Sequence, residues 1–586
     1  MIVRKSMRKG YLFTVFFLGL FQVGLAQEER PAEQPATSER PATIDSIDVV
    51  RDYRPVLADA VKIRRSPDMT NKRQYQPELP YQVLNEKLDI TTGTKRLTVR
   101  EMPFTRLETP MPNYAKIGVG NLGTLLGEVY VSTDQFVDTR VGGYLKHLNQ
   151  KGGIDGQTFS QQQFGLFGRR VFAPFTLSGE AGYNRYATQF YGVVSDNTAG
   201  SPDLNNNMNP DPEKQAFNDL YVKGELTSNA QEDDPDAVSY SLKADAYAYS
   251  SQAFDINENS FSVSGYFNKR VNVFNVGANV SGDFTSVQYP DHKLGNNITR
   301  LNPYIRFQGP NYNVTLGAAF VSEFGKGSRT NIFPTAEIDF AVVPQYAHLF
   351  GGIDGGVSKT SFRDLTQDNP FLGPNIAIQN AIDRLHVFGG IKGNAGATFG
   401  YKAKVFYRRV EGMAFYMNNL DAPYLFDVAY ESGDDASTWV GLEGEINVRV
   451  SETVNLGGKL NFNEYDLATF EEAWFMPKMR LSANARVNVS DKLYINGELL
   501  FQGQTYGLVQ NDAVNLQGYD WTAMTTGGRK VTIPSFADLS AAAEYRATDR
   551  IGVYVRVNNL LSSTYERYLF YPRLGLNVIG GVNFSF

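Results

Sequence analysis

The sequence predicts an all-β fold, a transmembrane antiparallel β-barrel of about 22 strands with a short N-terminal periplasmic or lumenal extension. Three observations predict this class. Apolar and polar residues alternate with a period of two from residue 114 to the end. Short turns and long loops alternate between those segments, as in bacterial outer-membrane barrels. A secretory leader stands at the N-terminus. We therefore expect the mature protein in the outer membrane of a Gram-negative cell.

The composition suits a barrel better than a helical membrane protein. Only 42% of the 586 residues are hydrophobic and the mean hydropathy is −0.32, which fits strands that are apolar on one face only. The 33 Tyr and 39 Phe residues suit aromatic belts at the two membrane interfaces. On composition alone, an aromatic-rich soluble β-protein remains the alternative.

Residues 1–26 are predicted to be a signal peptide. Basic residues between Arg4 and Lys9 precede an apolar run over residues 11–25. Cleavage is expected after Ala26, which leaves Gln27 as the first residue. The apolar run is too short for a membrane-spanning helix, so an anchor is the weaker interpretation.

Residues 27–113 form a Pro-rich extension. Ten of the 26 prolines fall here, among dense charges of both signs. Such a segment buries too little apolar surface to hold a compact core by itself. Two interpretations stay open: a solvated periplasmic tether, or a reduced plug that orders against a partner or inside the barrel.

Residues 114–586 are assigned to the barrel, and the last strand shows the alternation best. One face carries Leu574, Leu576, Val578, Gly580, Val582, Phe584 and Phe586. The other face is polar or small apart from Ile579. A soluble sandwich would turn the apolar face inward, whereas a barrel in a membrane turns it toward lipid. Many segments match the roughly 9–11 residues needed to cross a bilayer, which favours the barrel.

The connections give the strand count. Short turns occur at residues 451–452, 489–492 and 547–550, and longer loops at 195–213, 366–379 and 505–529. Assigning the connections back from the C-terminus gives about 22 strands. The ending Val582, Phe584 and Phe586 is interpreted as the C-terminal signal read by the outer-membrane insertion machinery.

Chemistry-bearing motifs are scarce. No cysteine is present, so disulfides, thiolate metal sites and a cysteine nucleophile are excluded. The four histidines are isolated, and we expect no metal, no cofactor and no enzyme activity. A net charge of −6 does not indicate a nucleic-acid partner. Glu443, Glu445 and Arg449 share the predicted lumen face of one strand and are candidate lumen charges.

The C-terminal part of the chain resembles the TonB-dependent receptors. The motifs that carry the resemblance are Val557–Leu561, Tyr565-Glu566, Tyr571-Pro572-Arg573, Gly580–Val582, and the upstream pair Val405–Arg409 and Thr438–Gly444. Tyr114–Asn121 and Leu145–Leu148 resemble a subgroup that lacks a standard plug. The resemblance implies a receptor barrel, and the short extension departs from the family because the usual plug motifs are missing.

Two functions follow as hypotheses. The first is a receptor or transport barrel, with TonB-linked uptake of a small solute, in which Asp48, Val49 and Val50 resemble a TonB-contact segment. The alternative is a plug-less structural barrel that serves as a subunit of an outer-membrane assembly or surface complex. The expected partners are outer-membrane lipid, the insertion machinery, and TonB or other envelope proteins.

Overall fold

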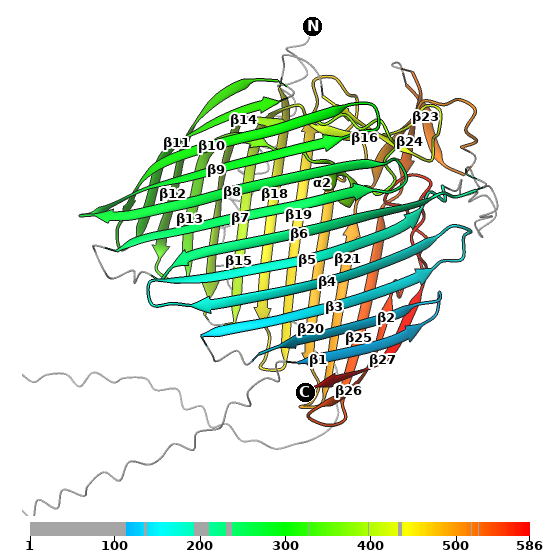
Figure 1. Ribbon diagram of the computed structural model, residues 1–586, viewed down its shortest axis with the longest axis horizontal. Coiled ribbons are helices and arrows are strands. Elements are labelled where there is room, and N and C mark those ends of the chain that lie inside the picture. The colour runs from blue at the N-terminus through cyan, green and yellow to red at the C-terminus, as the bar shows by residue number, and fades with distance from the viewer. Residues whose placement is uncertain are drawn as a thin grey trace, which may run out of the picture. The chain divides into compact units, whose positions relative to one another are not determined.

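The computed structural model describes residues 113–586 apart from 134–137, 193–208, 210, 230–236, 326, 397, 432–435, 517 and 525–526. In this part of the chain, 22 strands form one antiparallel sheet. Each barrel strand pairs with the next along the chain, and β27 returns to pair with β1, so the sheet closes into a barrel (Figure 1). The predicted fold class and strand number are confirmed.

The 22 barrel strands are β1 (Tyr114–Gly120), β2 (Leu125–Ser132), β3 (Thr139–Lys151), β4 (Thr158–Val171), β5 (Phe175–Gln189), β6 (Lys214–Ser228), β7 (Val238–Ser251), β8 (Ile256–Val271), β9 (Phe274–Gln288), β10 (Lys293–Gln308), β11 (Tyr312–Gly325), β12 (Arg329–Val343), β13 (Ala347–Ser358), β14 (Ala381–Ala395), β15 (Phe399–Glu411), β18 (Ser437–Arg449), β19 (Val454–Asp466), β20 (Met479–Asn488), β21 (Leu493–Gln502), β25 (Phe536–Arg546), β26 (Ile551–Asn558) and β27 (Asn577–Ser585). The loops contain the hairpin β16 (Ala414–Asn418) and β17 (Phe426–Tyr430), the small sheet of β22 (Thr505–Val509), β23 (Asp520–Ala523) and β24 (Arg529–Ile533), and the helix α2 (Phe362–Asp368).

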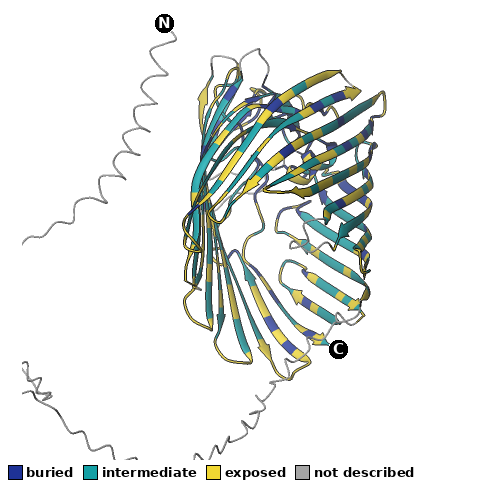
Figure 2. Ribbon diagram, turned by 90° about the vertical axis from the view of Figure 1, so that its left-hand side faces the viewer, coloured by how far each residue is buried: buried dark blue, intermediate teal, exposed yellow. Residues whose placement is uncertain are grey.

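The wall turns its apolar side chains outward. Ile117, Val119 and Ile332 are 63%, 66% and 62% exposed, although such side chains are usually buried in water-soluble proteins. The alternation of exposed and covered residues along the strands is visible in Figure 2. Lipid is the solvent that makes this surface favourable, so the barrel is built for a membrane, and the soluble sandwich is the wrong alternative.

The two ends of the barrel differ. The connections at one end, called here the turn rim, are short, such as 272–273, 309–311 and 547–550. The opposite end, called the loop rim, carries the long connections, and α2 and all five non-barrel strands lie there. Because periplasmic turns are short and extracellular loops long in bacterial barrels, the turn rim faces the periplasm. No helix in the described residues is long and apolar enough to span a membrane.

Two details of the sequence interpretation need correction. Leu574 and Leu576 were expected on the lipid face of the last strand, but β27 begins at Asn577 and both residues lie in the loop before it. The predicted loop 505–529 contains β22, β23 and the start of β24. These short strands pair with one another and not with the barrel, because the chain there has already left the wall.

Closure of the barrel depends on an aromatic ring that covers glycine. Gly118 of β1 and Gly581 of β27 both lie under Tyr554 of β26, and a Cβ on them would meet its hydroxyl oxygen at 2.2 Å and 2.6 Å. The Tyr554 hydroxyl donates a hydrogen bond to the carbonyl oxygen of Ile117 at 3.2 Å. The seam between the first and last strands is therefore bridged from the lumen side.

The same device recurs around the wall. Lumen-facing rings lie against glycine on a neighbouring strand, namely Tyr144 against Gly165, Tyr221 against Gly182, Tyr304 against Gly277 and Phe406 against Gly441. An aromatic ring that covers a strand glycine restores the packing that glycine lacks and lets the sheet curve. These pairs explain why glycine is frequent in the wall.

Candidate functional site: a loop lid over a polar lumen

The loops of the loop rim pack into a shared apolar core. We call the lid the described residues of loops 152–157, 190–213, 359–380, 412–436, 467–478, 503–535 and 559–576. Its most deeply buried side chains include Phe190, Phe362, Phe371, Leu372, Phe426, Trp474, Val531, Leu569 and Phe570. The lid therefore buries apolar residues as a soluble domain does, in contrast to the wall below it.

The lid spans the mouth of the barrel. Loop 559–576 follows β26 and loop 359–380 follows β13, so the two loops are eight strands apart in the ring of 22 strands. Arg567 of the first loop forms an ion pair with Asp368 of the second. The Tyr568 hydroxyl donates to the Asp368 carbonyl oxygen at 2.9 Å. Tyr191 of loop 190–213, which is a further six to eight strands away, contacts both Phe371 and Tyr571, so loops from three parts of the ring meet over the mouth.

Tyr571 is the hub of the lid. Its ring stacks on Phe371 with 3.5 Å between ring centroids. The Tyr191 ring meets it edge to face, with 4.9 Å between ring centroids. Its hydroxyl donates to the carbonyl oxygen of Tyr424 at 2.6 Å. The next residue, Pro572, accepts a hydrogen bond from the Gln157 side chain at 2.8 Å. One short segment thus holds four other loops together.

The hub segment also carries electrostatic and backbone strain. The Glu566 carboxylate accepts hydrogen bonds from the Tyr519 hydroxyl at 2.9 Å and the Phe570 N–H at 3.0 Å, and burial raises its pKa to about 7. Phe570 in this segment and Phe475 in loop 467–478 have φ angles of 73° and 59°, which are unusual for bulky residues. Such strain collects at ligand clamps and switch regions.

Polar contacts anchor the lid to the wall. The Glu258 carboxylate of β8 accepts hydrogen bonds from the N–H groups of Phe362 and Arg363 at 2.8 Å and 3.3 Å, where a negative charge favours the start of a helix. Arg363 also pairs with Asp219 of β6. The Tyr249 hydroxyl lies 2.7 Å from that of Thr366. The lid is thus attached through side chains and not by continuation of the barrel ladder.

The predicted lumen charges lie on the polar face of β18. Glu443 forms an ion pair with Lys404 of β15 at 3.7 Å. Glu445 lines a hollow of about 460 Å³ together with Lys459. Arg449 ends β18 at the turn rim and is exposed. The three residues alternate with outward-facing neighbours such as Ile446, and their part in solute passage stays a prediction.

The other predicted site residues fall into two groups. Val582, Phe584 and Phe586 are 44%, 41% and 44% exposed, and the last two rings stack at 5.5 Å; their reading by the insertion machinery stays a prediction. Ala26, Gln27, Asp48, Val49 and Val50 lie outside the described residues. Within the described part of the chain, no three His, Asp or Glu side chains are grouped as a metal site requires.

The sequence interpretation missed the lid. A run of aromatic residues over 565–571 that does not alternate could have predicted the lid. The sequence interpretation used this run only as one of the motifs of the family resemblance. A non-alternating aromatic run between two alternating strands indicates a packed loop. Which loops it packs against depends on the closure of the barrel, because the contacting loops are far apart in sequence.

The fold is that of outer-membrane receptors of iron and siderophores. The pyoverdine outer membrane receptor FpvA from Pseudomonas aeruginosa is 12% identical with a TM-score of 0.61, over 81% of this chain and 79% of that chain. The ferric-catecholate import receptor Fiu from E. coli K12 is 9% identical with a TM-score of 0.60, over 82% of this chain and 82% of that chain. The FrpB iron transporter from Neisseria meningitidis (F3-3 variant) is 11% identical with a TM-score of 0.61, over 82% of this chain and 82% of that chain.

No protein-family model matches the chain, and no curated protein matches it either. At these identities the structural likeness shows the fold and not the ligand. In its described residues the chain is an outer-membrane β-barrel of 22 strands with the fold of these receptors. These three proteins are named as two receptors and an iron transporter.

Proposed function

We propose that the protein is an outer-membrane receptor that admits a small solute through its lumen when the lid opens. The observation that carries this proposal is the contrast between a polar lumen wall and a lid that closes through side-chain packing. A ladder of backbone hydrogen bonds would have to break for a wall to open. A packed lid opens by separating loops, as in gated sites of other proteins.

We propose further that TonB supplies the energy through the segment around Asp48, Val49 and Val50. This rests on the resemblance of the segment to TonB-contact sequences. Deleting residues 45–50 tests it: uptake of the solute by whole cells should fall to the level of cells without TonB. Unchanged uptake would remove the TonB link and leave the barrel function in place.

The barrel function is tested by shortening the lid. In one variant, residues 563–573 are replaced by a short Gly-Ser linker that still joins β26 to β27. Proteoliposomes with this variant should swell in isosmotic solutions of small sugars several times faster than those with the intact chain. The control is a variant with the turn at 547–550 replaced, at the other rim, which should behave like the intact chain.

The same experiment decides between the two functions. A lid-shortened barrel that folds yet admits no solute would mean that the lumen is sealed below the lid. That result would favour the structural barrel, a subunit of an outer-membrane assembly. Folding is checked by the shift in gel mobility between unheated and heated samples.

A further inference from the structure

The barrel wall folds back on itself between β10 and β13. Arg300 of β10 donates a hydrogen bond to the carbonyl oxygen of Val357 of β13 at 3.2 Å, although β11 and β12 lie between these strands. Pairing shifts register near Gly355 of β13 and again within β14, and such bulges bend a sheet. The wall therefore forms a concave corner on its lumen side.

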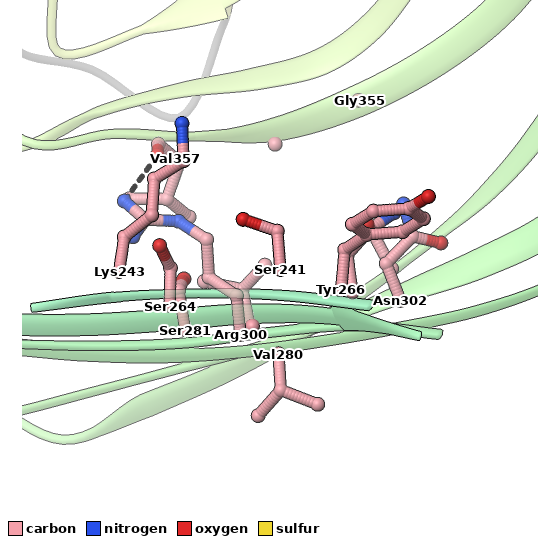
Figure 3. Close-up of a pocket in the computed structure, with 15 residues that line it drawn as sticks. Ser241, Lys243, Ser264, Tyr266, Val280, Ser281, Arg300, Asn302, Gly355 and Val357 are labelled. Atoms are coloured by element: carbon pink, nitrogen blue, oxygen red, sulfur yellow. Dashed lines mark hydrogen bonds between the residues drawn. The ribbon is translucent and has the colours of Figure 1, made fainter. Parts of the chain in front are cut away.

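A hollow occupies this corner. Its larger part has a volume of about 720 Å³, and a second part of about 370 Å³ continues it toward the loop rim. Both parts share Tyr266, Asn279 and Asn302. Figure 3 shows Tyr266 beside Asn302 on one side of the second part, with Gly355 on the strand opposite. The combined space is of the size found in small-molecule sites.

Two opposite charges in the hollow lack ionic partners. Among the described residues, neither Arg306 of β10 nor Glu337 of β12 forms an ion pair, whereas Arg300, Arg408 and His386 nearby are each paired with an aspartate. Arg306 donates to the Thr315 hydroxyl at 3.2 Å. The hollow thus offers one cation and one anion to a solute.

The register explains why the two charges stay apart. Arg306 pairs with Thr315, and Thr315 pairs with Glu337. Adjacent strands are about 4.8 Å apart, so the two backbones are roughly 10 Å apart. On its other side Glu337 faces Gly352, which has no side chain to offer. A solute that carries both an anion and a cation would contact both charges.

Amide groups line the part of the hollow beside Arg306, on β8, β9 and β10. Asn268, Asn279 and Asn302 lie in the wall of the hollow. The Oδ1 atoms of Asn268 and Asn302 are buried and accept no hydrogen bond from the described residues, which is uncommon for buried amides. Side-chain amides of this kind are suited to the N–H and C=O groups of a peptide.

We propose that this hollow binds a short peptide with free termini, its carboxylate on Arg306 and its ammonium group on Glu337. An extended chain spans about 3.3–3.6 Å per residue, so a tripeptide of roughly 10 Å is small enough for a hollow of about 720 Å³. The inference rests on the proposed function, since the hollow faces the path beneath the lid. It adds the class of solute that the path accepts.

The test is calorimetric titration of the full chain in detergent with tri-alanine, N-acetyl-tri-alanine and tri-alanine amide. Intact protein should bind tri-alanine at least about tenfold more tightly than either capped form, because each capped form loses one hydrogen-bonded contact between opposite charges. Arg306→Gln should weaken tri-alanine binding about tenfold and abolish its advantage over the amide. Glu337→Gln should abolish its advantage over the acetylated form.

The matched controls are Arg486→Gln on β20 and Glu544→Gln on β25, which lie on the lumen face of a different part of the wall. They should leave the Kd within about twofold. Three results would overturn the inference: no binding of tri-alanine, equal binding of the capped peptides, or equal losses in the control variants. Because the lid-shortened barrel is assayed with sugars, its swelling tests the proposed function independently of this result.

Discussion

The wall of this protein exposes apolar side chains on its outer surface, whereas the lid buries side chains of the same types. Leu301 on the outer wall is 46% exposed, whereas Leu569 in the lid is fully buried. The wall holds its shape through a continuous ladder of backbone hydrogen bonds, which lets its side chains face lipid. The lid has little regular structure and holds its shape through a side-chain core.

Because of this difference, opening the wall and opening the lid have different free-energy costs. Opening the wall would expose unpaired backbone groups inside a membrane, at several kcal/mol for each group. Opening the lid exposes apolar side chains to water, at about 25 cal/mol for each Å². Motion is therefore expected in the lid and not in the wall.

The largest expected effect is a failure of wall closure. In Gly581→Ala the new methyl carbon would lie 2.0 Å from the carbonyl oxygen of Ile117 and 2.6 Å from the Tyr554 hydroxyl. Overpacking usually costs about 1–3 kcal/mol and occasionally more; here the obstacle is a backbone oxygen that cannot move aside without shifting the strand, so the cost should lie at the upper end or above and little folded barrel should be recovered. Gly580→Ala is the matched control, because a Cβ there meets nothing within 4 Å. Heat-dependent gel mobility measures the folded fraction of both variants. Equal folded fractions would contradict the claim that close packing at Gly581 is needed to join the first and last strands.

A smaller effect separates the two environments of leucine. Leu569→Ala should cost about 2–5 kcal/mol as a buried large-to-small change, whereas Leu301→Ala should cost much less because lipid fills the space. Hydrogen exchange of residues 559–576 should rise in the first variant alone. If both variants lose the same stability, the lid has no core of its own.

We expect the pH to change the stability of the closed lid and to leave that of the wall unchanged. The pKa of Glu566 is about 7 in the closed lid and near its ordinary value when the lid opens, so the closed lid binds more protons between these values. Closure is therefore strongest at acidic pH and weakens as the pH rises through 7, by up to about 3 kcal/mol. Protease cleavage within 559–576 should be faster at pH 8 than at pH 5. Glu566→Gln should remove this dependence, and an unaltered profile in that variant would assign it to another group.

The sequence predicted the wall much better than the lid. Alternation over Ile551–Val557 and Val578–Phe584 depends on local geometry alone, so it predicted the faces of the strands; the order of short and long connections predicted their number. The lid depends on contacts such as Tyr571 with Phe371, which only barrel closure brings together. The hollow depends on the register shift near Gly355 and on the partners of Arg306 and Glu337, which no local pattern contains.

The most direct test of the account is to tie the lid shut across the mouth. Arg567 and Asp368 are 33% and 45% exposed at their side chains, and the chain has no cysteine, so Arg567→Cys with Asp368→Cys can be joined by a short thiol cross-linker that a reductant cleaves. Solute-permeant openings in planar bilayers should vanish on cross-linking and return on reduction, while single-cysteine variants stay unaffected. Identical openings in the linked and cleaved states would contradict the lid as the gate of this barrel.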